Sequence, residues 1–209
     1  MKIAVICANG KAGRLIVQEA VKRGLEVTAV VRGENRTQAP RAILKDLFDL
    51  TAQDLRDFDV VVDAFGAWTP ETLPQHSTSL RHLCGLLRGT DTRLLVVGGA
   101  GSLYTDPAHS ARLMDGPGFP DAFKPLAASM GQALEELRKE TEVKWTYLSP
   151  AADFQADRAP TGKVRLAGEE FTVNERGESV LGYADYAAAL IDEAVQGKHI
   201  QERISVLEA

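Results

Sequence analysis

A glycine turn near the amino terminus is the residue pattern with the clearest chemical meaning. It reads Cys7-Ala8-Asn9-Gly10-Lys11-Ala12-Gly13, between a short apolar run and a segment with helical periodicity. In a strand–turn–helix unit, the glycines let the backbone turn sharply and approach a pyrophosphate, whose charge the free N–H groups of the helix bind. We therefore predict a dinucleotide-binding turn. The alternative is an ordinary turn between a strand and a helix. A Walker P-loop is excluded, because no Gly-Lys-Ser/Thr sequence is present.

Arg32 is a second candidate for nucleotide recognition, because it follows the next predicted strand. NAD sites usually place an acidic residue there to bind the ribose 2′-hydroxyl. A guanidinium instead pairs with a 2′-phosphate through two hydrogen bonds. Arg32 therefore favours NADP(H), whereas Glu34 keeps NAD(H) open. A solvent-exposed arginine without a ligand is the alternative interpretation.

These residues must be positioned by strands that alternate with helices along the chain. Such alternation indicates an α/β protein, and we predict a Rossmann-like three-layer fold with a mostly parallel sheet. Apolar runs predict strands at 3–7, 27–31, 42–45, 60–64, 94–97, 145–148 and 204–207, and helical periodicity predicts helices at 11–23, 78–87, 123–139 and 182–194.

The chain length fits a single domain over residues 1–209, since no linker or internal repeat is present. Two segments, 105–122 and 151–180, lack clear periodicity and are rich in Asp, Gly or Pro. We expect these irregular segments to shape the substrate site.

Composition excludes several classes of function. The net charge is −5 and there is no basic run, so neither nucleic acid nor an anionic membrane is an expected partner. No apolar stretch has the roughly 20 residues that a membrane span needs, and we expect no secretory signal before the first strand. The two cysteines indicate free thiols in a reducing compartment, and neither they nor the four histidines have metal-ligand spacing. We expect a cytoplasmic monomer or weak homodimer with a small-molecule substrate and no metal.

Five segments of the chain resemble the atypical short-chain dehydrogenase/reductase group. More narrowly, they look like the small NAD(P)H-binding proteins often called NADH-flavin reductases, which are relatives of biliverdin reductase B and of NmrA-like sensors. The similarity extends over almost the whole chain. The segments are 2–6, 45–50, 63–67, 96–102 and 148–154.

This resemblance implies where a cofactor would bind. The group's first turn is Gly-Ala-Thr-Gly-x-x-Gly, and this chain matches it at Ala8, Gly10 and Gly13. Cys7 replaces the first glycine and Asn9 replaces the threonine. Cys7 is interpreted as a small residue at the end of a strand; a sensor thiol is the alternative.

By the same resemblance, three dipeptides would line the remainder of the cofactor. Asp46-Leu47 would border the adenine, and Phe65-Gly66 would lie against the ribose and pyrophosphate. Pro150-Ala151 would lie near the nicotinamide.

Catalysis is where the chain departs from this group. Typical members use a Tyr-x-x-x-Lys pair for proton transfer, but Leu126 and Met130 fall near those two positions. A conventional alcohol dehydrogenase is therefore not expected. Ser102 and Tyr104 are the nearest hydroxyls and are the catalytic candidates, as groups that orient a substrate carbonyl or ring nitrogen. Tyr104 serves equally well as a packing residue.

Two functions remain open at this stage. The first is an NAD(P)H-dependent reductase that passes hydride to a flavin- or quinone-like acceptor, with a flavin as substrate. Trp68, Phe123 and Phe154 would line its aromatic pocket, or would only pack the fold. The second is a non-catalytic NADP(H)-sensing regulatory protein of the NmrA-like type, which the missing Tyr-Lys pair favours.

Overall fold

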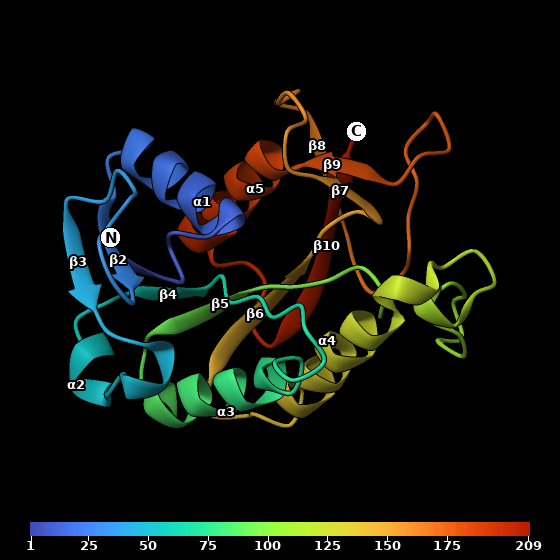
Figure 1. Cartoon of the computed structure of the whole chain (residues 1–209). Helices are drawn as coiled ribbons and strands as arrows, with labels where there is room; N and C mark the ends of the chain where they lie inside the picture. Colours follow the sequence, from blue (N-terminus) through green and yellow to red (C-terminus); the bar gives the residue numbers. More distant parts are fainter.

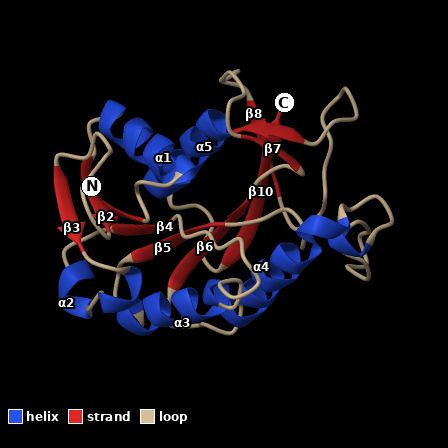
Figure 2. Cartoon of the chain, viewed as in Figure 1, coloured by secondary structure: helices blue, strands red, loops and turns tan.

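The computed structural model describes residues 1–209 and contains an eight-stranded sheet between two layers of helices (Figures 1 and 2). The strand order is β3-β2-β1-β4-β5-β6-β10-β8. Every neighbouring pair is parallel except β8 and β10. The predicted Rossmann-like α/β fold is confirmed. The strands are β1 (Lys2–Ile6), β2 (Glu26–Val31), β3 (Arg41–Leu44), β4 (Val60–Asp63), β5 (Arg93–Val97), β6 (Lys144–Ser149), β8 (Val164–Ala167) and β10 (Glu202–Glu208).

The helices cover both faces of the sheet (Figure 1). One layer holds α1 (Lys11–Lys22) and α5 (Tyr183–Gln196), and the other holds α2 (Ala52–Leu55), α3 (Gln75–Leu87) and α4 (Lys124–Leu137). The four predicted helices are confirmed with small shifts at their ends. The start of α3 was predicted three residues late, because its first turn is polar in sequence and adds nothing to the apolar stripe. The four-residue α2 was not predicted.

The central strand β1 is apolar on both sides because both of its faces are buried. Ile3 and Val5 face the α1–α5 layer, whereas Ala4 and Ile6 face the layer of α3 and α4. A strand buried on both faces has no polar alternation, as in other parallel sheets with two helical layers.

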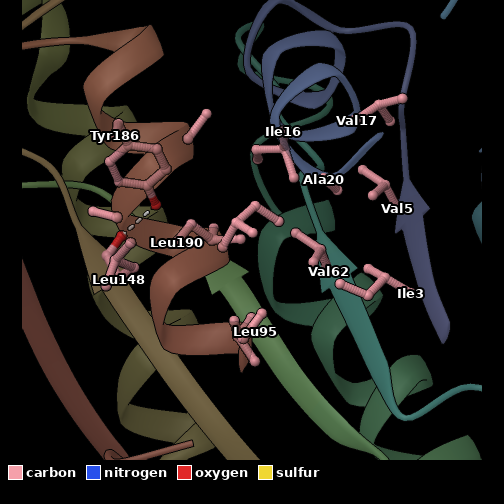
Figure 3. Close-up of a cluster of buried hydrophobic side chains, with 14 of the residues drawn as sticks. Ile3, Val5, Ile16, Val17, Ala20, Val62, Leu95, Leu148, Tyr186 and Leu190 are labelled. Carbon is pink, nitrogen blue, oxygen red and sulfur yellow. Dashed lines mark hydrogen bonds between the residues drawn. The ribbon is translucent and has the colours of Figure 1, made fainter. Parts of the chain in front are cut away.

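The α1–α5 layer packs through the apolar stripes that the sequence predicts (Figure 3). Ile16 and Ala20 of α1 and Leu190 of α5 meet the sheet in one buried cluster. The hydroxyl of Tyr186 donates a hydrogen bond of 2.7 Å to the carbonyl of Leu148, which fastens α5 to the end of β6. No helix of this structure has the length and apolar character that a membrane crossing requires.

The segment 151–180, predicted to be irregular, contains strands. Here β7 (Asp153–Gln155) pairs in parallel with β9 (Val180–Gly182), and β8 pairs antiparallel with β10. Sequence periodicity missed them because each has three or four residues, and β8 exposes Arg165 and Leu166 in succession. They form because neighbouring strands offer free hydrogen-bonding groups. The segment 105–122 contains the 3₁₀ turn Leu113–Asp115, the start of the 3₁₀ turn Asp121–Phe123, and Arg112, which forms an isolated bridge with Tyr104.

Candidate functional site

The predicted site residues follow the carboxyl ends of parallel strands. The glycine turn follows β1, Arg32 follows β2, Phe65 follows β4 and Pro150 follows β6. Because parallel strands end at the same edge of a sheet, these segments lie on one side of the molecule. In open α/β sheets this edge is where ligands bind.

The glycine turn is tight and brings α1 close to β1. Cys7 has a φ of 57°, and its carbonyl accepts a hydrogen bond of 2.9 Å from the N–H of Gly10. A Cβ on Gly13 would stand 2.7 Å from the carbonyl oxygen of Cys7 and 2.9 Å from the Cα of Ala8. Only glycine at position 13 therefore permits this approach of the helix to the strand.

The amino terminus of α1 fits an anionic ligand. Gly10 is the N-cap and no side chain caps the helix, so the first N–H groups have no partner within it. The first turn carries Lys11 and no acidic residue. The free N–H groups and the helix dipole together make this terminus suitable for a pyrophosphate.

Cys7 is a poor candidate for a sensor thiol. Burial, together with the nearby Asp63 carboxylate, raises the pKa of the Cys7 thiol to about 12. A reactive cysteine needs a lowered pKa. Its left-handed backbone favours glycine, which is the residue that the resembled motif carries here. The structure supports the interpretation of Cys7 as a small residue at the end of a strand.

Arg32 and Asp46 lie together at the corner beyond β2 and β3. The Arg32 side chain is 85% exposed, and its Nε is 4.0 Å from Oδ2 of Asp46. The other carboxylate oxygen of Asp46 accepts a 3.0 Å bond from the N–H of Phe48. Leu47 points into the core. At this corner Arg32 is therefore an exposed cation held by one weak ion pair, free to change partner.

Asp63, at the end of β4, is a buried carboxylate that sequence reasoning missed. Its Oδ1 accepts a 3.0 Å hydrogen bond from the N–H of Phe65, the first residue of the predicted Phe65-Gly66 contact. Burial raises the pKa of Asp63 to about 6. A lone acid that ends the apolar run Val60-Val61-Val62 was the available signal.

Asp63 also lines a small cavity beneath this segment. The cavity measures about 10 Å³, the room that one water molecule needs. Tyr147 of β6 and His76 of α3 share it. Burial raises the pKa of Tyr147 to about 12 and lowers the pKa of His76, so both groups remain uncharged at neutral pH. The cavity therefore brings together side chains from five elements, β4, α3, β5, α4 and β6, with no cation among them.

The glycine-rich loop after β5 lies flat against Tyr147 and α4. A Cβ on Gly98 would overlap the ring of Tyr147, and one on Gly101 would overlap the Cβ of Ala127. The Sδ of Met130 lies 3.0 Å from the Cβ position of Gly99. Met130, near the position of the resembled group's lysine, therefore fills the space below this loop.

The two catalytic candidates have different surroundings. Ser102 is buried, and its Oγ accepts a 3.3 Å hydrogen bond from Arg203. Because arginine only donates, the hydroxyl hydrogen of Ser102 stays available for another acceptor. Tyr104 stacks on His109 with ring centroids 4.2 Å apart, and the Arg203 guanidinium lies 5.6 Å from its ring centroid. Tyr104 therefore packs this loop, while Ser102 retains a free donor.

The two residues predicted to lie near the nicotinamide are at the end of β6. Pro150 and Ala151 follow β6 and are both buried. Of the three aromatic candidates, Phe154 stacks on Tyr183 of α5 at 3.9 Å and is a packing residue. Trp68 is 71% exposed and Phe123 is 53% exposed, so both remain available to a ligand.

Comparison with known proteins identifies a family. Residues 7–194 match the family described as NAD(P)H-binding. YwnB of Bacillus subtilis (strain 168) is 46% identical over 210 residues, which cover 99% of this chain and 98% of YwnB. A crystal structure from Streptococcus pneumoniae TIGR4, named a "putative NADH-flavin reductase", is 57% identical with a TM-score of 0.98 over 100% of both chains. A "putative epimerase" from Bacteroides thetaiotaomicron is 35% identical with a TM-score of 0.86, over 99% of this chain and 96% of that one.

Proposed function

This chain belongs to the NAD(P)H-binding family, and on that basis we propose that it is an NADPH-dependent reductase with a flavin- or quinone-like acceptor. The observation that carries the proposal is the glycine turn at the start of α1. There Gly13 permits a close helix approach, and the helix terminus presents free N–H groups with no competing acid. The reductase name of the Streptococcus pneumoniae relative supports the same class of reaction.

The preference for NADPH over NADH rests on Arg32. Its exposed guanidinium has one ion pair, with Asp46 at 4.0 Å. Such an exposed pair contributes at most about 1 kcal/mol, so a 2′-phosphate would displace it readily. NADH is the second choice, since Glu34 lies on the same loop.

The class of acceptor that we propose depends on the side chains at the two positions where the resembled group carries its Tyr-Lys pair. The bound cofactor supplies the hydride. Leu126 and Met130 cannot donate the proton that reduction of an ordinary carbonyl requires. An electron-poor ring such as a flavin or quinone accepts hydride without a strong acid, and water supplies the balancing proton. The hydroxyl hydrogen of Ser102 is available for a further hydrogen bond. We propose that this hydroxyl orients a ring carbonyl or ring nitrogen of the acceptor.

The proposal also covers the compartment, the oligomeric state and the substrate site. We propose a cytoplasmic enzyme, active as a monomer or weak homodimer, with substrate-site segments 105–122 and 151–180 around one domain. We propose that the exposed Trp68 and Phe123 stack on the planar substrate.

A turnover assay tests this function. The protein is mixed with NADPH and, in separate reactions, FMN, riboflavin or menadione, and the absorbance of the reduced nicotinamide is followed. We expect oxidation faster than in protein-free solution, and its loss in a folded Gly13→Val variant. Cofactor binding without oxidation above the free-solution rate would instead support the NADP(H)-sensing regulator and reject the reductase.

A further inference from the structure

The loop between β2 and β3 carries charges of both signs beside the glycine turn. Arg32 is followed by Glu34 and Arg36, all with exposed side chains. An acid at such a position suits the 2′-hydroxyl of NAD, and a cation suits the 2′-phosphate of NADP. The conformation of this loop therefore decides which charge a cofactor meets.

Asn9 of the glycine turn holds this loop at two points. Its Nδ2 donates a 2.9 Å hydrogen bond to the carbonyl of Glu34, and its Oδ1 accepts a 2.9 Å bond from the N–H of Arg36. Both polar groups of the Asn9 side chain are therefore used on one short stretch of loop, 25 and 27 residues away in sequence.

The remainder of the loop is held by hydrogen bonds within it and by Ala39, which is buried in the core beside the sheet. The Asn35 side chain bonds the carbonyl of Ala39 and the N–H of Thr37, and the Thr37 hydroxyl accepts a bond from the N–H of Ala39. These contacts make residues 35–39 a compact unit. Asn9 fixes that unit against the turn where the pyrophosphate is expected.

This fixed conformation places a cation beside the loop's acid. Nε of Arg36 lies 3.8 Å from Oε2 of Glu34. Both ion pairs at this corner are exposed and weak: Glu34 pairs with Arg36, and Arg32 pairs with Asp46 at 4.0 Å. In this arrangement the acid of the loop faces its own cation, and Arg32 shares only the Asp46 carboxylate, which also accepts the N–H of Phe48.

We propose that Asn9 determines the cofactor preference as a positioning residue: it fixes residues 34–36 so that Arg36 neutralises Glu34 and Arg32 is left for the 2′-phosphate. This inference rests on the proposed use of NADPH and deepens it. A threonine, as in the resembled motif, has a shorter side chain and cannot span both partners in the same way. Without the two hydrogen bonds of Asn9, the Glu34 carboxylate moves away from Arg36 and repels the 2′-phosphate.

Ligand binding tests the proposal without turnover. Adenosine 2′,5′-bisphosphate and 5′-AMP are titrated by calorimetry into the wild-type protein and into Asn9→Ala and Asn9→Thr variants, whose folding is checked by thermal melting. We expect the wild type to prefer the bisphosphate, and both variants to lose about tenfold of that preference, the size of one charge-assisted hydrogen bond. Gln38→Ala, an exposed substitution on the same loop, should leave the preference unchanged.

A double variant separates positioning from a general loss of structure. Adding Glu34→Gln to Asn9→Ala removes the acid that Asn9 is proposed to restrain, so the preference should return. Equal weakening of both ligands in the Asn9 variants, or no return in the double variant, overturns the role of Asn9. If the wild-type protein binds neither ligand or both equally, the NADPH proposal fails too. If it prefers the bisphosphate and Asn9→Ala keeps that preference, only the role of Asn9 fails.

Discussion

The carboxylate of Asp63 accepts a hydrogen bond of 3.0 Å from the backbone N–H of Phe65, at the point where the chain leaves β4. The carboxyl group is buried in the sheet. Through this hydrogen bond, its charge acts on the backbone of Phe65, a predicted cofactor contact. Burial destabilises the ionised form, which is why the pKa rises from an ordinary value of 3.8 to about 6.

The folded protein should therefore lose stability between acid and neutral pH through Asp63. A raised folded-state pKa means that this group's contribution is fully present below pH 3.8 and is lost as the pH rises through about 6. At 1.36 kcal/mol per unit of pKa shift, ionisation of Asp63 costs the folded state about 3 kcal/mol relative to the unfolded state. Asp63→Asn removes that cost. Urea unfolding at pH 4 and pH 7 should show the variant gaining on the wild type at the higher pH; a constant difference would contradict this.

Gly13→Ala should weaken both folding and nucleotide binding. The added Cβ would stand 2.7 Å from the Cys7 carbonyl oxygen, so α1 must shift, at a cost of about 1–3 kcal/mol. Thermal melting and NADPH titration measure the two effects. The matched control is Gly85→Ala in α3, where a Cβ meets open space. That control should raise stability by up to about 1 kcal/mol through helix propensity and leave binding unchanged.

Arg32→Ala should weaken NADPH binding about tenfold and NADH binding little, because a charge-assisted bond to the 2′-phosphate is lost. Fluorescence titration with each cofactor measures both affinities. Arg41→Ala is the control, since Arg41 is an exposed arginine at the start of β3, away from the carboxyl ends of the strands. Equal losses for both cofactors would show that Arg32 does not recognise the 2′-phosphate.

Ser102→Ala should lower turnover with the flavin or quinone acceptor roughly tenfold, the effect of one lost hydrogen bond, without changing NADPH affinity. Tyr104→Phe should leave turnover within about twofold, since it keeps the stack on His109. Steady-state kinetics at saturating NADPH distinguish the two. The reverse result, a large loss only in Tyr104→Phe, would make Tyr104 the catalytic hydroxyl.

Cys7 should resist thiol reagents in the folded protein, because burial raises its pKa to about 12 and little thiolate exists at neutral pH. A Cys84→Ala variant leaves Cys7 as the single thiol. Labelling should become rapid only in urea. Fast labelling of the folded variant, or loss of NADPH binding after mild oxidation, would restore the sensor interpretation.

The layered α/β architecture and the glycine turn could both be predicted from the amino-acid sequence. Both follow from local rules: Ile3 to Ile6 are apolar without alternation because β1 is buried on both faces, and the stripe of Ile16 and Ala20 repeats with the helix. Gly10 and Gly13 predict a turn because they stand between a strand and a helix.

The hydrogen-bond partners of the site residues could not be predicted from the sequence, because they come from distant segments that the fold brings together. Asn9 bonds a loop 25 residues away, Ser102 bonds Arg203 across 101 residues, and Asp63 becomes a buried acid because β1 and β5 flank β4. The strands of segment 151–180 likewise depend on pairing between distant residues, β8 with β10 and β7 with β9. Local periodicity records which side of an element faces the core, but a hydrogen-bond partner or a change in pKa depends on which distant segments pack together.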